Sequence, residues 1–207
     1  VYFGDGFTGG NWPHVNFWFY PDLLQGGRAQ FLNAGVSAAN TRKTLEVCDC
    51  IRDTGRKFET AVLMCGVDDL IDGIAIQETI DNFEGILEKA KRFSKEVIVC
   101  TLTPRTDGLM GAEKDINEYL RGLNSREGVT VADVALAFQE HPRKGSLTTS
   151  GFPNEEGQSL IAEVVRKAWS KFTEGEGFPL MKKQTLASRM VFRFSQKVQR
   201  LAAILDR

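Results

Sequence analysis

The chain has 207 residues, of which 42% are hydrophobic and 26% charged, and its formal net charge is −1. These values predict a globular protein with one domain, large enough to bury a core without disulfides or metals. They exclude a membrane-spanning protein, since no apolar run approaches the ~20 residues needed to cross a bilayer.

The four cysteines indicate a reducing, cytoplasmic compartment. Cys65 and Cys100 lie in apolar runs, which is typical of reduced, buried thiols. Cys48 and Cys50 form a C-x-C pair with no histidine nearby, so they do not match the ligand spacing of a zinc site. We therefore expect neither a metal nor another cofactor.

Apolar runs typical of buried strands alternate with segments of helical periodicity. In residues 75–93, for example, Ile76, Ile80, Phe83 and Leu87 recur at helical spacing with charges between them. Continuous apolar strands separated by helices predict a parallel sheet covered on both faces, a three-layer α/β/α sandwich formed by residues 1–177. The expected strands are residues 1–3, 29–35, 60–66, 96–102 and 128–135, and the expected helices are residues 41–53, 75–93, 112–123 and 154–172.

Residues 178–207 form a basic extension to this domain. They contain seven cations and one acid, a charge of +6, whereas residues 1–177 contain 19 cations and 26 acids, a charge of −7. At 100° per residue, a helix over 186–207 places a basic stripe beside an apolar stripe. We expect the apolar stripe to dock this helix on the domain. The basic stripe contains Arg189, Arg193, Lys197, Arg200 and Arg207, and the apolar stripe contains Met190, Phe194, Val198, Leu201 and Leu205.

Five short motifs lie where function gathers in an open parallel sheet, at the carboxyl ends of strands or before the last domain helix. They are Gly4-Asp5-Gly6, residues 33–41 with Gly35 and Thr41, residues 66–69, residues 101–105 and residues 149–157. Except for residues 101–105, they resemble, in order, the conserved blocks of the SGNH (GDSL-type) hydrolases: G-D-S, N-x-G-x-x-x-x-x-T, G-x-N-D and D-x-x-H. The resemblance spans residues 1–173 and implies the α/β sandwich of these esterases and lipases.

At each chemical position of that family the chain lacks the required group. Gly6 replaces the serine nucleophile, and Phe152 replaces the histidine base. Thr149 replaces the aspartate that orients the histidine, and Asp68 replaces the oxyanion-stabilising asparagine. Gly35, a main-chain donor, remains. The resemblance therefore implies a pseudo-hydrolase rather than an enzyme.

Two other arrangements of chemical groups are weighed here. A displaced triad would use Thr8 and His141, but surface-loop histidines are more common than a base held ~3 Å from a nucleophile. His14 is the second histidine of the chain. Asp5, Asp68 and Asp69 would form a carboxylate cluster for a hard cation, unless Asp5 caps the turn after the first strand and Asp69 caps a short helix.

RNA is the partner that the charge distribution favours. Phosphate binding needs converging guanidinium and ammonium groups, and further cations lie near the old catalytic face and at the start of the extension. Aromatic residues at 16–20 offer stacking surfaces for bases, although core packing is their commoner role. The candidate RNA-binding residues are Arg42, Lys43, Arg105, Lys182, Lys183, Arg189, Arg193, Lys197 and Arg200.

Other interpretations of the basic extension remain open. It also fits a solvated helix face, a membrane-surface helix, or a protein-interaction module whose tail helix docks on a partner. Residual esterase activity is the third functional class. The combination of lost catalytic groups and a basic extension resembles a catalytically degenerate member of the family, and this resemblance implies binding of messenger RNA.

Overall fold

The computed structural model of the protein describes residues 1–9, 24, 32–104, 111–149 and 151–170, and the account below concerns these residues. The basic extension, residues 178–207, lies outside them. Within the described part of the chain, no helix is both long and apolar enough to span a membrane.

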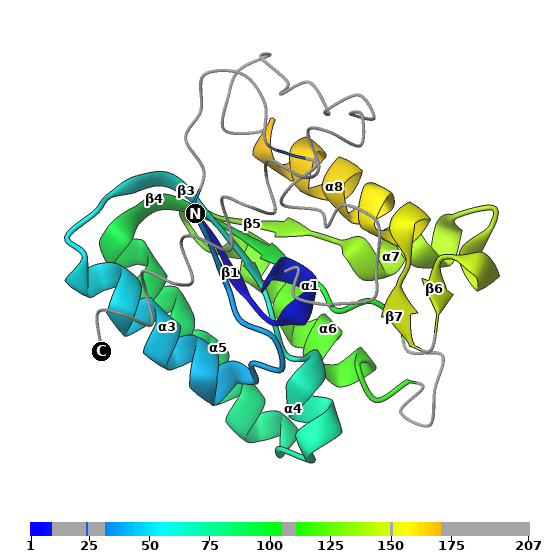
Figure 1. The fold of residues 1–207 in the computed structure, drawn as a ribbon, viewed down its shortest axis with the longest axis horizontal. Helices are drawn as coiled ribbons and strands as arrows, with labels where there is room; N and C mark the ends of the chain where they lie inside the picture. The colour runs from blue at the N-terminus through cyan, green and yellow to red at the C-terminus, as the bar shows by residue number, and fades with distance from the viewer. Residues whose placement is uncertain (10–23, 25–31, 105–110, 150, 171–207) are drawn as a thin grey trace, which may run out of the picture.

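Five parallel strands form the central sheet, in the order β2-β1-β3-β4-β5 (Figure 1). The chain goes from β1 to β2 at one edge and then returns past β1 to β3, so the strand order reverses at β1. Such a reversal opens a crevice at the carboxyl ends of the strands. The strands are β1 (Tyr2–Gly4), β2 (Asn33–Gly35), β3 (Phe58–Met64), β4 (Ser94–Cys100) and β5 (Val129–Ala132).

Helices cover both faces of the sheet, and the three-layer α/β/α prediction is confirmed. In Figure 1, α3 and α5 run side by side over one face, and α8 covers the other. A short hairpin, β6 (Thr148–Thr149) with β7 (Phe152–Pro153), precedes α8. The helices are α1 (Gly6–Gly9), α3 (Thr41–Asp53), α4 (Val67–Asp72), α5 (Ile76–Phe93), α6 (Lys114–Gly122), α7 (Val134–Glu140) and α8 (Glu155–Trp169), with 3-10 turns η1 (Leu123–Ser125) and η2 (Lys144–Ser146).

The core forms because the strands are apolar on both faces and therefore need helices on both sides. Every residue from Val97 to Cys100 in β4 is buried. Phe93, the last residue of α5, packs edge-to-face on Phe3 of β1, with ring centroids 6.0 Å apart. This contact joins the first strand to the helix layer, so the core is continuous across the sheet.

Most boundaries of the helices and strands agree with those predicted from the sequence, and one prediction is wrong. The expected strand over 128–135 ends at Ala132, because the Asp133 carboxylate accepts a hydrogen bond from Leu136 N (3.1 Å) and caps α7. The helix predicted over 41–53 is confirmed at both ends. Within the described residues, the second strand is limited to Asn33–Gly35.

Candidate functional site

The carboxyl edge of the sheet begins at the junction of β1 and α1. Gly4 has φ +143°, and a Cβ at this position would lie 1.8 Å from the Met64 carbonyl oxygen. Only glycine fits this backbone. The buried Asp5 then donates its main-chain N–H to the same carbonyl (3.0 Å), and its own carbonyl accepts from Thr8 N and Gly9 N. Gly6, at the nucleophile position, is the first residue of α1 and is buried.

Gly35, the surviving donor of the implied oxyanion hole, is already engaged. Its N–H donates to Asn33 Oδ1 (3.0 Å), and Asn33 Nδ2 donates to the Thr8 carbonyl (2.8 Å). A Cβ on Gly35 would lie 2.4 Å from Gly9 N, so the end of α1 lies directly against β2. The amide that would stabilise an oxyanion is thus satisfied within the protein.

Asp69 is the centre of a buried hydrogen-bond network at the same edge. Its carboxylate accepts from Thr41 N (2.8 Å), Thr41 Oγ1 (2.5 Å) and Thr79 Oγ1 (3.1 Å). Asn82 Nδ2 donates to Thr41 Oγ1 (2.9 Å), which links α5 to the start of α3. The network therefore ties α3, α4 and α5 together and presents no free carboxylate oxygen to a ligand.

This geometry corrects two alternatives for the aspartates. Asp69 does not cap its own helix: the residue before α4 is Gly66, which has no side chain, and Asp69 instead satisfies the first N–H of α3. Asp68 lies half-buried in the first turn of α4. Among the described residues, which include Asp5, Asp68 and Asp69, no three His, Cys, Asp or Glu side chains form a group that could hold a metal ion.

The β6–β7 hairpin carries the positions of the family's aspartate and histidine. Thr149 and Phe152 are direct partners in its antiparallel register. Phe152 is half-buried and packs against the core, whereas Thr149 is exposed. Asn154 follows and caps α8 by accepting from Glu156 N and Gly157 N. The hairpin lies on the side of the molecule where the strands end (Figure 1).

Thr8 and His141 have separate surroundings. Thr8 is fully buried, and its Oγ1 lies 3.5 Å from the Met64 carbonyl at the end of β3. His141 follows α7; its Nδ1 accepts from Arg143 N (3.2 Å), and its Nε2 lies 4.0 Å from Glu156 Oε1. These contacts place the histidine in a surface turn beside α8, which is the common role of a loop histidine.

Two of the candidate RNA-binding cations pair with acids at the start of α3. Arg42 Nε lies 2.5 Å from Glu78 Oε1, and this hydrogen bond raises the pKa of Arg42. Lys43 Nζ lies 2.6 Å from Glu46 Oε2. All four side chains are more than two-fifths exposed, so these pairs are solvated. The other candidates lie outside the described residues, as do His14 and residues 16–20; those candidates are Arg105, Lys182, Lys183, Arg189, Arg193, Lys197 and Arg200.

The cysteines agree with the expectation of reduced thiols. Cys65 and Cys100 are free and fully buried, as predicted, and Cys48 is also buried. Burial raises the pKa of the Cys48 thiol to about 12. A thiol with so high a pKa is a poor nucleophile at neutral pH.

The parallel sheet, the glycine junction after β1 and the ordered loops at its carboxyl edge define an α/β sandwich of the SGNH-hydrolase type. A family model of the GDSL-like lipase/acylhydrolase family matches residues 2–160. The chain belongs to this family. No significant relative was found among curated protein sequences.

Several solved structures share the fold. A lipolytic protein of the G-D-S-L family from Veillonella parvula DSM 2008 is 20% identical, covers 82% of this chain and 97% of its own, and superposes with a TM-score of 0.71. A putative lipolytic protein of the same family from Desulfitobacterium hafniense DCB-2 is also 20% identical, covers 81% and 97%, and has a TM-score of 0.67. AlinE4, an SGNH-hydrolase family esterase, is 22% identical, covers 83% and 94%, and has a TM-score of 0.58. At these identities the likeness establishes the fold alone.

Three polar residues of this edge were missed from the sequence: Asn33, Thr79 and Asn82. Asn33 opens the N-x-G motif, which is a signal for a polar role. Thr79 and Asn82 lie inside an ordinary amphipathic helix, and only their polar character on a half-buried face distinguishes them.

Proposed function

We propose that this domain is a non-catalytic member of its family that binds RNA through cationic surfaces. One observation carries the first part of the proposal. The framework of the carboxyl edge is intact, with Gly4, Thr41 and Asp69 all engaged, while the four chemical positions hold Gly6, Asp68, Thr149 and Phe152.

Acyl transfer needs a nucleophile, a base and donors for the oxyanion. A glycine at position 6 provides no side chain, and a phenylalanine at position 152 cannot accept a proton. Asp68 would repel a developing negative charge, and the Gly35 N–H already donates to Asn33. These features support a loss of hydrolysis rather than a shift of substrate.

The charge distribution supports the second part of the proposal. The described residues carry 16 cations and 22 acids, a charge of −6, so phosphate attraction must come from local groups or from the +6 of residues 178–207. Arg42 and Lys43 contribute after exchanging their acid partners for phosphates, because solvent-exposed ion pairs stabilise the fold only weakly.

The sequence pattern most resembles the OSK domain of the insect protein Oskar. By this resemblance the RNA is a messenger RNA, and the protein acts in germ plasm assembly and messenger RNA localisation, in cytoplasmic ribonucleoprotein granules. Its partners would include proteins of those granules as well as RNA.

RNA binding is tested with the chain of 207 residues and a labelled single-stranded RNA, by fluorescence anisotropy across a salt series. The triple change Arg189→Glu, Arg193→Glu and Lys197→Glu should abolish binding, because these residues share one stripe of the expected helix. The far-ultraviolet circular dichroism spectrum reports folding. A folded triple variant that binds as the wild type does would rule out the tail as the RNA-binding element and favour the protein-interaction module.

Catalysis is tested separately with short-chain p-nitrophenyl esters and a fluorophosphonate probe. We expect no turnover above buffer and no labelled protein. Gly6→Ser should also be inactive, because nothing in the hairpin activates the new hydroxyl. Several structural neighbours are described as lipases or esterases, and covalent labelling of the wild type would assign this domain to their activity instead.

A further inference from the structure

The described cations fall into two groups. Nine of the 16 form ion pairs with acids, such as Lys89 with Asp49 (2.7 Å) and Arg126 with Glu84 (2.5 Å). The other seven form no ion pair, and all but Arg166 are exposed. The seven are Arg56, Lys57, Lys91, Lys114, Lys144, Arg166 and Lys167.

Three of these seven meet at the amino edge of the sheet, the end opposite the family's catalytic loops. Arg56 and Lys57 precede β3, and Lys91 lies in the last turn of α5. The chain enters β4 directly after α5, and Phe58 pairs with Ser94 in the parallel register. This register holds the two entry points on neighbouring strands, about 4.8 Å apart.

Hydrogen bonds fix the positions of both lysines. Lys57 Nζ donates to the Arg92 carbonyl at the end of α5 (2.5 Å), and Lys91 Nζ donates to the Glu127 carbonyl before β5 (2.8 Å). An ammonium group has three donors, so each lysine keeps donors for a ligand after one is used on a carbonyl. The two charges are therefore held close to the backbone while they remain exposed.

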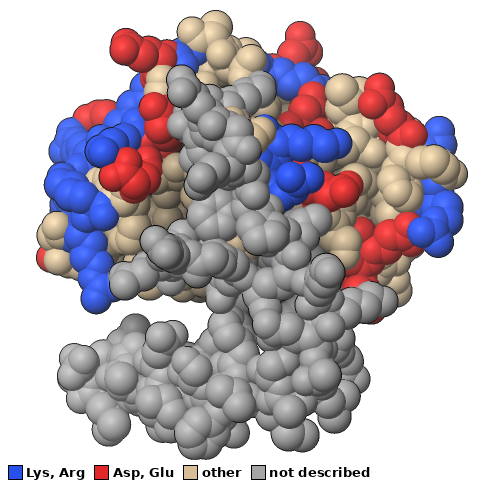
Figure 2. Space-filling view, turned by 90° about the horizontal axis from the view of Figure 1, so that it is seen from above, with Lys and Arg blue, Asp and Glu red and all other residues tan. Residues whose placement is uncertain are grey.

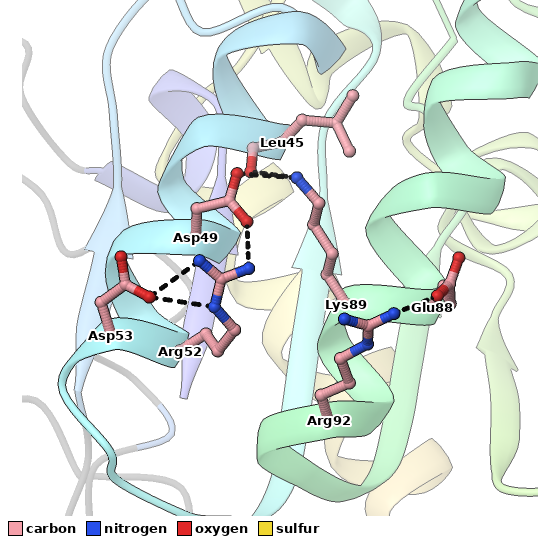
Figure 3. Close-up of polar contacts among 7 residues, drawn as sticks. All are labelled: Leu45, Asp49, Arg52, Asp53, Glu88, Lys89 and Arg92. Atoms are coloured by element: carbon pink, nitrogen blue, oxygen red, sulfur yellow. Dashed lines mark hydrogen bonds and ion pairs between the residues drawn. The ribbon is translucent and has the colours of Figure 1, made fainter.

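The remaining charges at this end are mostly balanced. Figure 3 shows Arg52 with Asp49 and Asp53, Lys89 with Asp49, and Arg92 with Glu88. Lys95 pairs with Glu59 (2.8 Å), and both of these side chains are more than 70% exposed. Glu96 and Glu127 are the acids of this edge that form no ion pair among the described residues. Three unpaired cations thus exceed the two unpaired acids by one, and Arg92 and Lys95 are two further cations whose exposed acid partners can be exchanged for phosphates.

We infer that this amino-edge cluster (Arg56, Lys57, Lys91, Arg92 and Lys95) is a second binding surface for the phosphodiester backbone of RNA. In Figure 2, Lys and Arg side chains line the left edge of the molecule, which in Figure 1 is the end where α3 and α5 finish and β3 and β4 begin. Phosphate contacts of this kind add affinity without reading sequence. The inference rests on the proposed function and places an RNA contact on the folded body, away from the old catalytic loops.

The test compares two triple variants of the chain of 207 residues. The amino-edge variant is Arg56→Gln, Lys57→Gln and Lys91→Gln, in which glutamine retains a donor for the carbonyls. The control variant is Lys114→Gln, Lys144→Gln and Lys167→Gln, which removes three exposed, unpaired cations from α6, η2 and α8. Both variants change the net charge by the same amount. Any difference in RNA affinity between them therefore depends on where the removed cations lie.

The readout is fluorescence anisotropy with a labelled single-stranded RNA from low to high salt. Each phosphate contact contributes about 0.7 to the slope of log affinity against log salt. The amino-edge variant should lose about 2 from this slope and bind roughly fifty-fold more weakly at 0.15 M salt, since each lost contact is worth a factor of about four there. The control should keep the slope and lose less than about threefold in affinity.

The outcomes separate this inference from the proposed function. If the wild type binds RNA and both variants retain its slope, RNA binding stands and the amino-edge surface is overturned. If the two variants lose slope equally, binding follows net charge and the surface is again overturned. A wild type that does not bind RNA overturns both proposals. An unchanged circular dichroism spectrum and urea midpoint establish that the variants are folded.

Discussion

The two edges of the sheet use polar side chains in opposite ways. At the carboxyl edge, Asp69 is fully buried and its carboxylate accepts three hydrogen bonds from α3 and α5. At the amino edge, the pair Lys95–Glu59 leaves both side chains more than 70% exposed. Buried hydrogen bonds to charges are worth a few kcal/mol each, whereas exposed ion pairs are worth little.

This difference indicates which groups can still meet a ligand. Asp69, Thr41 and Thr79 at the carboxyl edge stabilise the fold because they are buried and hydrogen-bonded to one another, and for the same reason they are closed to a partner. The cations of the amino edge stabilise the fold weakly and can exchange one anion for another. The Asp69 network therefore makes the carboxyl edge rigid, whereas the amino edge offers exposed cations.

The largest effect should come from the glycine that ends β1. Gly4→Ala places a methyl group 1.8 Å from the Met64 carbonyl oxygen at a φ that alanine rarely adopts. We expect the variant not to fold, because the energy of this clash is comparable to the total free energy of unfolding of a domain, about 5–15 kcal/mol. Gly6→Ser, two residues later, should fold with a stability within about 1 kcal/mol of wild type. Circular dichroism and urea unfolding measure both, and a folded Gly4→Ala would contradict the geometry.

The second prediction compares two adjacent aspartates. Asp69→Asn replaces one accepting oxygen by an amide that faces the donors of Thr41 or Thr79, and should lower the free energy of unfolding by about 2–4 kcal/mol. Asp68→Asn is the control; it is half-buried and near-isosteric, and should cost less than about 1 kcal/mol. Equal losses in urea titrations would show that the buried network does not dominate this edge.

Local patterns explain how much of this architecture could be predicted from the sequence. The periodicity of residues 41–53 and 75–93 gave both helices, since each has one apolar face. The motifs that follow the first three strands predicted that Gly6, Gly35 and Asp68 lie at the carboxyl edge, because the carboxyl ends of parallel strands meet at one edge of the sheet. Asp133 was read as part of a strand, since its neighbours are apolar and a cap inside such a run gives no periodic signal.

Long-range polar contacts explain what could not be predicted. Glu78 pairs with Arg42 across 36 residues, and no spacing rule connects the two. Asp69 satisfies α3, a helix that starts 28 residues earlier, rather than its own helix. Likewise, Lys57 and Lys91 meet at one edge because of the strand register, and the sequence places them in different elements.

In burial, Asp133 lies between Asp69 and the exposed ion pairs of the amino edge, and it offers a test by pH. Burial by itself raises the pKa of Asp133, but hydrogen bonds from Arg121, Leu136 N and Thr101 outweigh it and lower this pKa overall. A lowered pKa means that the stabilisation is present above the unfolded value of about 3.9 and is lost as pH falls through the folded value. Asp133→Ala should cost about 1–2 kcal/mol at pH 7. The gap to wild type should shrink below pH 4 in urea titrations; a constant gap would contradict the shift.

The smallest effect on stability should come from the amino edge, where two exposed acids form ion pairs with Arg92 and Lys95. Glu59→Gln with Glu88→Gln removes the exposed partners of Lys95 and Arg92, and should change the free energy of unfolding by less than about 0.5 kcal/mol. The same variant should bind single-stranded RNA more tightly, by about three- to tenfold at 0.15 M salt, because two more cations face the phosphates. The matched control, Glu155→Gln with Glu163→Gln, removes two exposed acids from α8 and should gain much less. A large loss of stability in the Glu59 and Glu88 variant would show that these ion pairs stabilise the fold. A gain in affinity no larger than that of the control would show that the amino-edge cations do not bind RNA, and the two edges would then differ in burial alone.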